Sequence, residues 1–167
     1  MENREQIDLL EQRMFDFNRG DAMRIQHLMK VHRFAQMMGR MEHLDEHTQF
    51  LTECAALVHD IGIRPAEEKY GACTGPLQER EGPAYARPML EELGLAPADI
   101  DRICYLVGHH HTYTNIDGPD YQILVEADFL VNFYEDGLSR EAVEHALEQI
   151  FRTESGKALC RTIYAVE

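Results

Sequence analysis

Apolar residues recur at helical spacing along nearly the whole chain. The first such face consists of Ile7, Leu10, Met14 and Phe17. Spacings of three and four place these side chains on one side of a helix, where they can enter a core. Gly20 is suited to end this helix. Asp21 is suited to begin the next one, because its side chain can accept a hydrogen bond from a free backbone N–H group.

The same pattern predicts further helices and two loops. The helices are expected at about 21–39, 45–60, 84–93, 97–110, 121–134, 139–151 and 156–166. Residues 61–82 contain many glycines and prolines and are predicted to form a long loop, and residues 111–120 a second one. No alternating strand pattern of useful length is present. The chain is therefore predicted to be all-α, a single helical domain over 1–167.

Composition narrows the possible partners. The chain has 167 residues, 44% of them apolar, which fits a folded protein. Its formal net charge is −14, with 30 acidic residues against 16 lysines and arginines. Binding to nucleic acid or to an anionic membrane depends on basic residues, so neither partner is expected. An anionic substrate would have to meet a metal or a few local basic side chains.

The cysteines and the N-terminal residues predict a cytoplasmic protein. Cys54, Cys73, Cys104 and Cys160 form no closely spaced pair, so we expect reduced thiols. The N-terminal residues are charged and lack the apolar segment of a secretory signal. No apolar run approaches the roughly 18 residues that a membrane span needs.

Several ionisable residues fall on positions that should face the core. They come from different predicted helices: His27, the adjacent pair His59 and Asp60, His110, and Asp128. Any one of them could be a buried residue satisfied by a neighbour. Together they favour a metal centre inside a helical bundle, because unpaired buried charges are costly. Mixed imidazole and carboxylate ligands suit Mn, Fe, Co, Ni or Zn.

This ordered set resembles the HD-domain superfamily of metal-dependent phosphohydrolases. The segments that carry the resemblance are "RIQHLMKVHRFA", "LVHDIG" and "LVEADFLVN", within a motif core of about 21–135 flanked by helices at both ends. The segments "EKYG" and "QEREGPAYAR" and the terminal "FRTESGKALCRTIY" resemble a bacterial subgroup. The resemblance implies metal ligation by His27, His59, Asp60 and Asp128.

One position departs from the superfamily pattern. Many relatives carry a further histidine where this chain has Gly82, which removes one expected ligand of a second metal. Glu79, Glu81 and His110 are the candidates for additional ligands, with the other histidines of 109–111 close by.

The expected activity is hydrolysis of a small phosphate ester, with a nucleotide as the expected class. Asp60 would both bind the metal and orient a water molecule, and His110 or His109 would act as the acid. The basic residues expected to contact the substrate are Arg24, Lys69, Arg80 and Arg87. Two alternatives stay open: a non-catalytic regulatory domain that binds a nucleotide or a metal, and an HD-type di-iron oxygenase. The N-terminal helix could form a homodimer interface.

Overall fold

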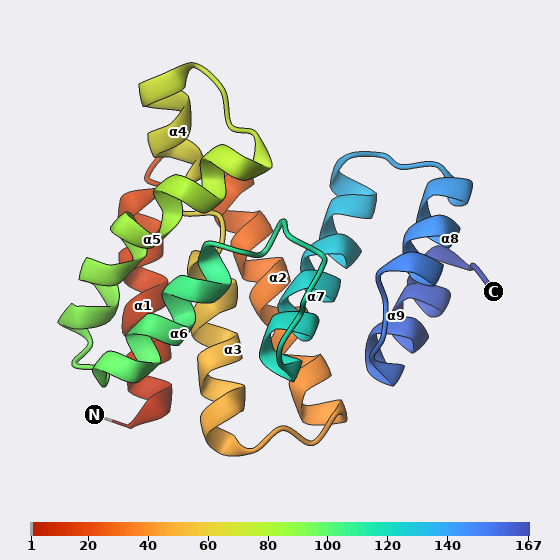
Figure 1. Ribbon diagram of the computed structural model, residues 1–167, viewed down its shortest axis with the longest axis horizontal. Helices are drawn as coiled ribbons and strands as arrows, with labels where there is room; N and C mark the ends of the chain where they lie inside the picture. The colour runs from red at the N-terminus through yellow and green to blue at the C-terminus, as the bar shows by residue number, and fades with distance from the viewer. Residues whose placement is uncertain (1) are drawn as a thin grey trace.

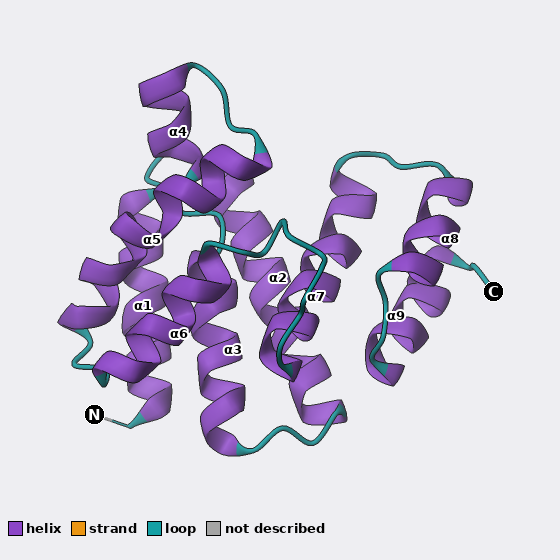
Figure 2. Cartoon of the chain, in the orientation of Figure 1, coloured by secondary structure: helices purple, strands orange, loops and turns teal. Residues whose placement is uncertain are grey.

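Nine helices and the segments between them make up residues 2–167, the part of the chain that the computed structural model describes (Figures 1 and 2). The helices are α1 (Asn3–Phe17), α2 (Ala22–Met41), α3 (Glu46–Val58), α4 (Ile63–Tyr70), α5 (Gly75–Glu92), α6 (Pro97–Val107), α7 (Pro119–Glu135), α8 (Arg140–Gln149) and α9 (Glu154–Tyr164). No strand occurs in this range, so the all-α prediction is confirmed.

Helices α2, α3 and α7 lie in the middle of the bundle, with α1, α5 and α6 on one side and α8 and α9 on the other (Figure 1). Each of the three central helices packs against the other two. Buried apolar side chains form one continuous cluster that runs from Leu10 of α1 to Cys160 of α9. The central trio is therefore the most enclosed place in the fold, and polar side chains that it holds are shielded from water.

The predicted caps and faces of α2 explain how His27 enters this trio. The Asp21 side chain accepts a hydrogen bond from the backbone N–H of Arg24 at 3.0 Å, which fixes where α2 begins. Leu28, Val31 and Ala35 are fully buried on the inner face, and His27 lies on the same side one turn before Val31. The His27 imidazole therefore lies in the core, because it shares the apolar face of α2.

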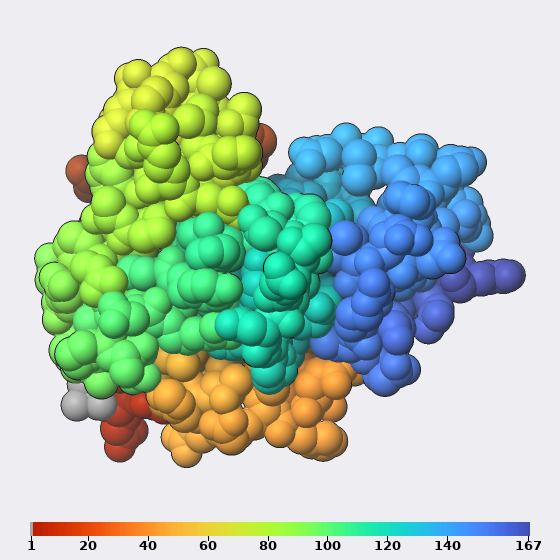
Figure 3. Space-filling model, in the orientation of Figure 1, coloured from red at the N-terminus to blue at the C-terminus, as the bar shows by residue number. Residues whose placement is uncertain are grey.

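The prediction of a long loop over 61–82 is wrong. This segment contains α4 and the beginning of α5, and together they stand out as a lobe of the surface (Figure 3). Pro65 and Pro76 lie in the first turns of their helices, where a backbone N–H group has no hydrogen-bond partner within the helix, so its absence breaks no hydrogen bond. Gly71 ends α4 in the left-handed conformation, with φ of 66°. Most of the glycines and prolines therefore mark the ends of two helices, whereas Gly82 lies inside α5.

Gly62 and Gly82 allow α5 to lie directly on the turn that follows α3. A Cβ atom on Gly62 would lie 2.4 Å from the carbonyl oxygen of Gln78 and 2.7 Å from the Gly82 nitrogen. A Cβ atom on Gly82 would lie 2.6 Å from Cγ1 of Val107. Position 82 is a backbone contact with no room for an imidazole, so the departure from the superfamily pattern has a steric reason.

Two further features bear on the expectations from the sequence. All four cysteines are free thiols, as expected. Among residues 2–167, no helix combines the length and the apolar character that a membrane crossing requires.

Candidate metal centre

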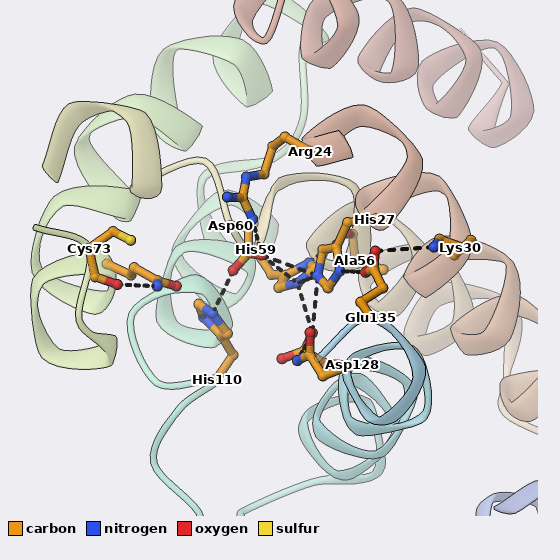
Figure 4. A network of polar contacts seen from close by, with 12 residues as sticks. Arg24, His27, Lys30, Ala56, His59, Asp60, Cys73, His110, Asp128 and Glu135 are labelled. Atoms are coloured by element: carbon orange, nitrogen blue, oxygen red, sulfur yellow. Dashed lines mark hydrogen bonds and ion pairs between the residues drawn. The ribbon is translucent and has the colours of Figure 1, made fainter. Parts of the chain in front are cut away.

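Four predicted ligands meet between the central helices (Figure 4). His27 comes from α2, His59 and Asp60 from the end of α3 and the turn after it, and Asp128 from α7. None is more than 6% exposed. Nε2 of His27 lies 3.3 Å from Nε2 of His59, and 3.2 Å from a carboxylate oxygen of both Asp60 and Asp128. Nε2 of His59 lies 3.6 and 3.5 Å from the same two oxygens.

These separations fit the coordination shell of a divalent ion. Ligand bonds of about 2.1 Å put neighbouring donor atoms roughly 3.0 Å apart in an octahedron and roughly 3.4 Å apart in a tetrahedron. Five of the six donor-to-donor distances among these four atoms run from 3.2 to 3.6 Å. His27, His59 and Asp60 each offer a ligand atom within 4.8 Å of the other two, so these three are already spaced as ligands of one ion, and Asp128 lies beside both imidazoles.

The protonation of the rings supports the same conclusion. Nδ1 of His59 lies 2.8 Å from the Ala56 carbonyl oxygen, and Nδ1 of His27 lies 2.5 Å from Oε1 of Glu135. A carbonyl oxygen only accepts hydrogen bonds, so Nδ1 of His59 carries the proton and its Nε2 presents a lone pair. The neutral ring of His27 is oriented in the same way. Two nitrogen lone pairs and two carboxylates then face one another, an arrangement that requires a positive charge between them.

Protons supply that charge in the metal-free protein. Burial lowers the pKa of His27, but hydrogen bonds to Asp128 and Asp60 outweigh burial and raise it to about 11. Burial alone would raise the pKa values of Asp60 and Asp128, yet the neighbouring histidines hold both below their usual range. The carboxylates therefore stay ionised, and His27 holds a proton at the position where a metal would bind.

Metal binding is consequently expected to release protons and to weaken as the pH falls. The ion must displace the His27 proton, whose pKa of about 11 lies above any working pH. Each displaced proton weakens apparent binding about tenfold per pH unit. Titration calorimetry in buffers of different ionisation enthalpy should show about one or more protons released per ion. Binding with no proton release and no pH dependence would contradict this protonation scheme.

Asp60 also contacts two groups outside the four-ligand cluster. Its Oδ1 lies 3.3 Å from Nε2 of the fully buried His110, and its Oδ2 lies 3.4 Å from Nη1 of Arg24 (Figure 4). Burial lowers the pKa of His110, but the hydrogen bond to Asp60 raises it above its usual value. Asp60, His110 and His111 form a second group with ligand atoms close enough for one ion. Asp60 is therefore the residue around which the whole site is built.

The histidine segment after α6 is held in place by its neighbours. Oε1 of Glu79 accepts hydrogen bonds from the His111 backbone N–H at 2.9 Å and from the Thr112 hydroxyl at 3.0 Å. The Tyr121 hydroxyl donates to the His109 carbonyl oxygen at 2.7 Å. Glu79 thus supports the segment that carries His110, and its own carboxylate lies outside both groups of possible ligands found within residues 2–167.

Other predicted site residues have partners elsewhere. His109 stacks on Tyr105 and its Nδ1 lies 2.7 Å from that residue's carbonyl oxygen, so the ring does not join the cluster. Glu81 pairs with Lys69 and accepts a hydrogen bond from Tyr70. Lys69 and Glu81 thus bind each other between α4 and α5. The prediction of a long loop gave no reason to expect this pair.

Two of the predicted substrate-contacting arginines are also engaged away from the cluster. Arg80 lies over the Tyr70 ring and donates to its hydroxyl at 2.7 Å. Arg87 pairs with Asp101 of α6 at 2.8 Å. Of the four basic residues expected at the substrate, the structure brings only Arg24 to the cluster of His27, His59, Asp60 and Asp128.

One histidine of the 109–111 segment joins the second group of possible ligands: His111, whose Nε2 is 2.7 Å from Oε1 of Gln78. One residue near the cluster, Glu135, was missed in the sequence. Glu135 contacts the outer nitrogen of His27 and also pairs with Lys30 at 3.1 Å. Glu135 follows Asp128 by seven residues, two helical turns, and this spacing is the signal that could have identified it.

Comparisons with known proteins agree with this geometry. The family model of the HD domain matches residues 24–153, more than half of the chain. A crystal structure described as a predicted HD superfamily hydrolase, from an uncultured Thermotogales bacterium, is similar in fold. The TM-score is 0.65 and the identity 24%, over 97% of this chain and 84% of that one. Curated protein sequences gave no match. Because the family match spans all the converging residues, the chain belongs to the HD-domain family.

Proposed function

We propose that this protein is a metal-dependent phosphohydrolase that acts on a small phosphate ester, with a nucleotide as the substrate class. The observation that carries the proposal is the inward-facing set of His27, His59, Asp60 and Asp128, in which the two imidazole nitrogens lie 3.2–3.6 Å from the two carboxylate oxygens. A divalent cation bound there would polarise a phosphoryl oxygen and lower the pKa of a water molecule. Asp60 and the side chains around it would orient the water molecule, donate a proton to the leaving group and bind the phosphate.

Three side chains in and around the cluster would carry out these remaining steps: Asp60, His110 and Arg24. Asp60 places one carboxylate oxygen toward the ligand cluster and the other toward His110, so it can orient a water molecule beside the cluster. His110 holds its Nδ1 proton on the Val107 carbonyl oxygen at 2.8 Å, which directs Nε2 at the site. A proton on that Nε2 is available to a departing alkoxide. Arg24 brings a permanent positive charge next to Asp60.

Arg24 is the best placed residue to bind the phosphate. Its Nη1 touches Asp60, and its buried Nε has no hydrogen-bond partner among residues 2–167. A guanidinium with unused donors matches the geometry of phosphate oxygens. In a chain of net charge −14, this positive charge would offset the repulsion that a phosphate ester meets.

Replacing Arg24 with methionine should therefore lower kcat/KM for the phosphate ester about 10- to 100-fold, the loss expected for a hydrogen bond to a charged group. Metal content should stay at the wild-type value, because Arg24 is not a ligand. Steady-state kinetics with elemental analysis would measure both. The matched control is Arg64→Met, since Arg64 is an exposed arginine of α4 bound to Glu68. Unchanged kcat/KM in the Arg24 variant would remove Arg24 from the substrate site.

The test of the proposed function is a substrate panel on protein reconstituted separately with Mn²⁺, Co²⁺, Zn²⁺ and Fe²⁺. Nucleoside monophosphates, sugar phosphates and an aryl phosphate would be assayed for phosphate release. We expect release that depends on metal, with the highest kcat/KM for a nucleotide. Preference for a sugar phosphate would retain the reaction and reject the substrate class.

The same panel separates the two alternative functions. Tight nucleotide binding without turnover under every metal would favour a regulatory domain. Oxygen consumption by the iron-loaded protein, with no phosphate release, would favour an oxygenase. Either result would overturn the proposed hydrolysis while leaving the metal centre in place.

A further inference from the structure

The outer nitrogen of His27 has a carboxylate partner from the same helix that supplies Asp128. Oε1 of Glu135 lies 2.5 Å from Nδ1 of His27, and Oδ1 of Asp128 lies 3.2 Å from Nε2 of the same ring (Figure 4). Helix α7 therefore offers an acceptor to each nitrogen of one imidazole. Asn132, between them on α7, donates to Oδ1 of Asp128 at 2.9 Å. These three residues form a polar stripe along α7, and its two carboxylates contact His27 of α2.

The position of Glu135 is electrostatically unfavourable unless it has cationic partners. It is the last residue of α7, where the helix dipole and the free carbonyl groups disfavour a negative charge. Its side chain is only 18% exposed, so water does little to offset this cost. Lys30 donates to Oε2 at 3.1 Å, one turn after His27 on α2. Lys30 therefore holds one carboxylate oxygen while the other is directed at the imidazole.

We propose that Glu135 is a positioning residue of the metal centre, which accepts the Nδ1 proton of His27 and so fixes the ring with Nε2 directed at the metal. Ligating histidines are commonly oriented by such a hydrogen bond, and losing the partner weakens metal affinity about 10- to 100-fold. Lys30 assists by fixing the carboxylate. The inference rests on the metal centre of the proposed function and does not depend on the identity of the substrate.

The test measures Zn²⁺ affinity of the full chain by competition with a chromophoric chelator. Glu135→Ala should raise the Zn²⁺ Kd about 10- to 100-fold. Glu135→Gln keeps an acceptor oxygen without the charge and should give a smaller rise, and Lys30→Met should also give a smaller rise. The matched control is Asp136→Ala, which removes an exposed carboxylate one residue further on and should leave the Kd unchanged.

A second readout follows the ring itself and separates positioning from a structural contact. In Zn²⁺-loaded protein, a ¹⁵N–¹H spectrum of the histidine side chains should show His27 with its proton on Nδ1, and Glu135→Gln should shift that signal. This readout still applies if Glu135→Ala does not fold, because the glutamine variant preserves the shape of the side chain.

The outcomes distinguish this inference from the proposed function. A wild-type protein that binds Zn²⁺, together with Glu135 variants of unchanged Kd and an unmoved His27 signal, would overturn the inference alone. A lowered melting temperature of the metal-free Glu135→Ala protein with no change in Kd would also overturn it, since that result describes a contact between helices. A wild-type protein that binds none of Mn²⁺, Fe²⁺, Co²⁺, Ni²⁺ and Zn²⁺ would overturn the metal centre and the inference together.

Discussion

Replacing Asp60 with asparagine is expected to abolish both metal binding and hydrolysis. Asp60 gives one oxygen to the cluster around His27 and the other to His110, so a single amide changes both sets of contacts. Asparagine preserves the volume but removes the charge that a divalent ion needs. We expect kcat/KM to fall at least about 1,000-fold, which corresponds to about 4 kcal/mol of lost transition-state stabilisation.

Two measurements on this variant separate the chemistry from the fold. Elemental analysis should show that the metal is lost, and circular dichroism should show that the helices are retained. The control is Asp16→Asn, an exposed aspartate on α1 that should keep wild-type metal content and turnover. Full metal content and normal turnover in the Asp60 variant would show that Asp60 is neither a ligand nor a catalytic residue.

Introducing histidine at position 82 is expected to destabilise the protein and to add no metal ligand. A side chain there would push against Val107, and a Cβ atom alone would already come within 2.6 Å of it. Gly82 also lies against the backbone of Gly62, which cannot move without shifting the turn that carries Asp60. Overpacking a tight core site costs about 1–3 kcal/mol and sometimes more, and we expect roughly 3 kcal/mol or more for an imidazole.

Urea unfolding of the Gly82→His protein would measure this loss. The matched control is Ala84→His, which puts the same residue on an exposed position of the same helix and should change the free energy of unfolding by less than about 0.5 kcal/mol. A Gly82→His protein of wild-type stability that binds an additional metal ion would show that position 82 can serve as a ligand site after all.

The register of the apolar faces was enough to predict which side chains meet. His27 and Asp128 each continue an apolar stripe of their helix and are buried where α2 and α7 approach α3. His110 is buried as predicted, but it lies in the turn after α6, which ends at Val107 and not at residue 110 as predicted. A helix presents residues at fixed angles, so its inward positions can be read from the sequence. The doublet of His59 and Asp60 followed from the apolar run before it.

Contacts between separate elements could not be predicted in the same way. Glycines and prolines over 61–82 indicated a loop, because helix ends and loops share these residues. With α4 and α5 unrecognised, the pairing of Lys69 with Glu81 could not be foreseen, and both residues were assigned to the site. Arg87 forms an ion pair with Asp101, and this contact depends on how α5 packs against α6. The sequence shows which basic residues the chain contains. The packing of the helices determines that Arg24, and not Lys69 or Arg87, lies beside Asp60.

The most direct test of the metal centre is the metal content of the untagged protein, purified without chelators or a nickel column and analysed by elemental mass spectrometry. The cluster of His27, His59, Asp60 and Asp128 predicts about one tightly bound divalent ion per chain, present as purified or after reconstitution. Absence of bound metal under both conditions, with Mn, Fe, Co, Ni and Zn each tried, would contradict it and would make the four residues a protonated structural network.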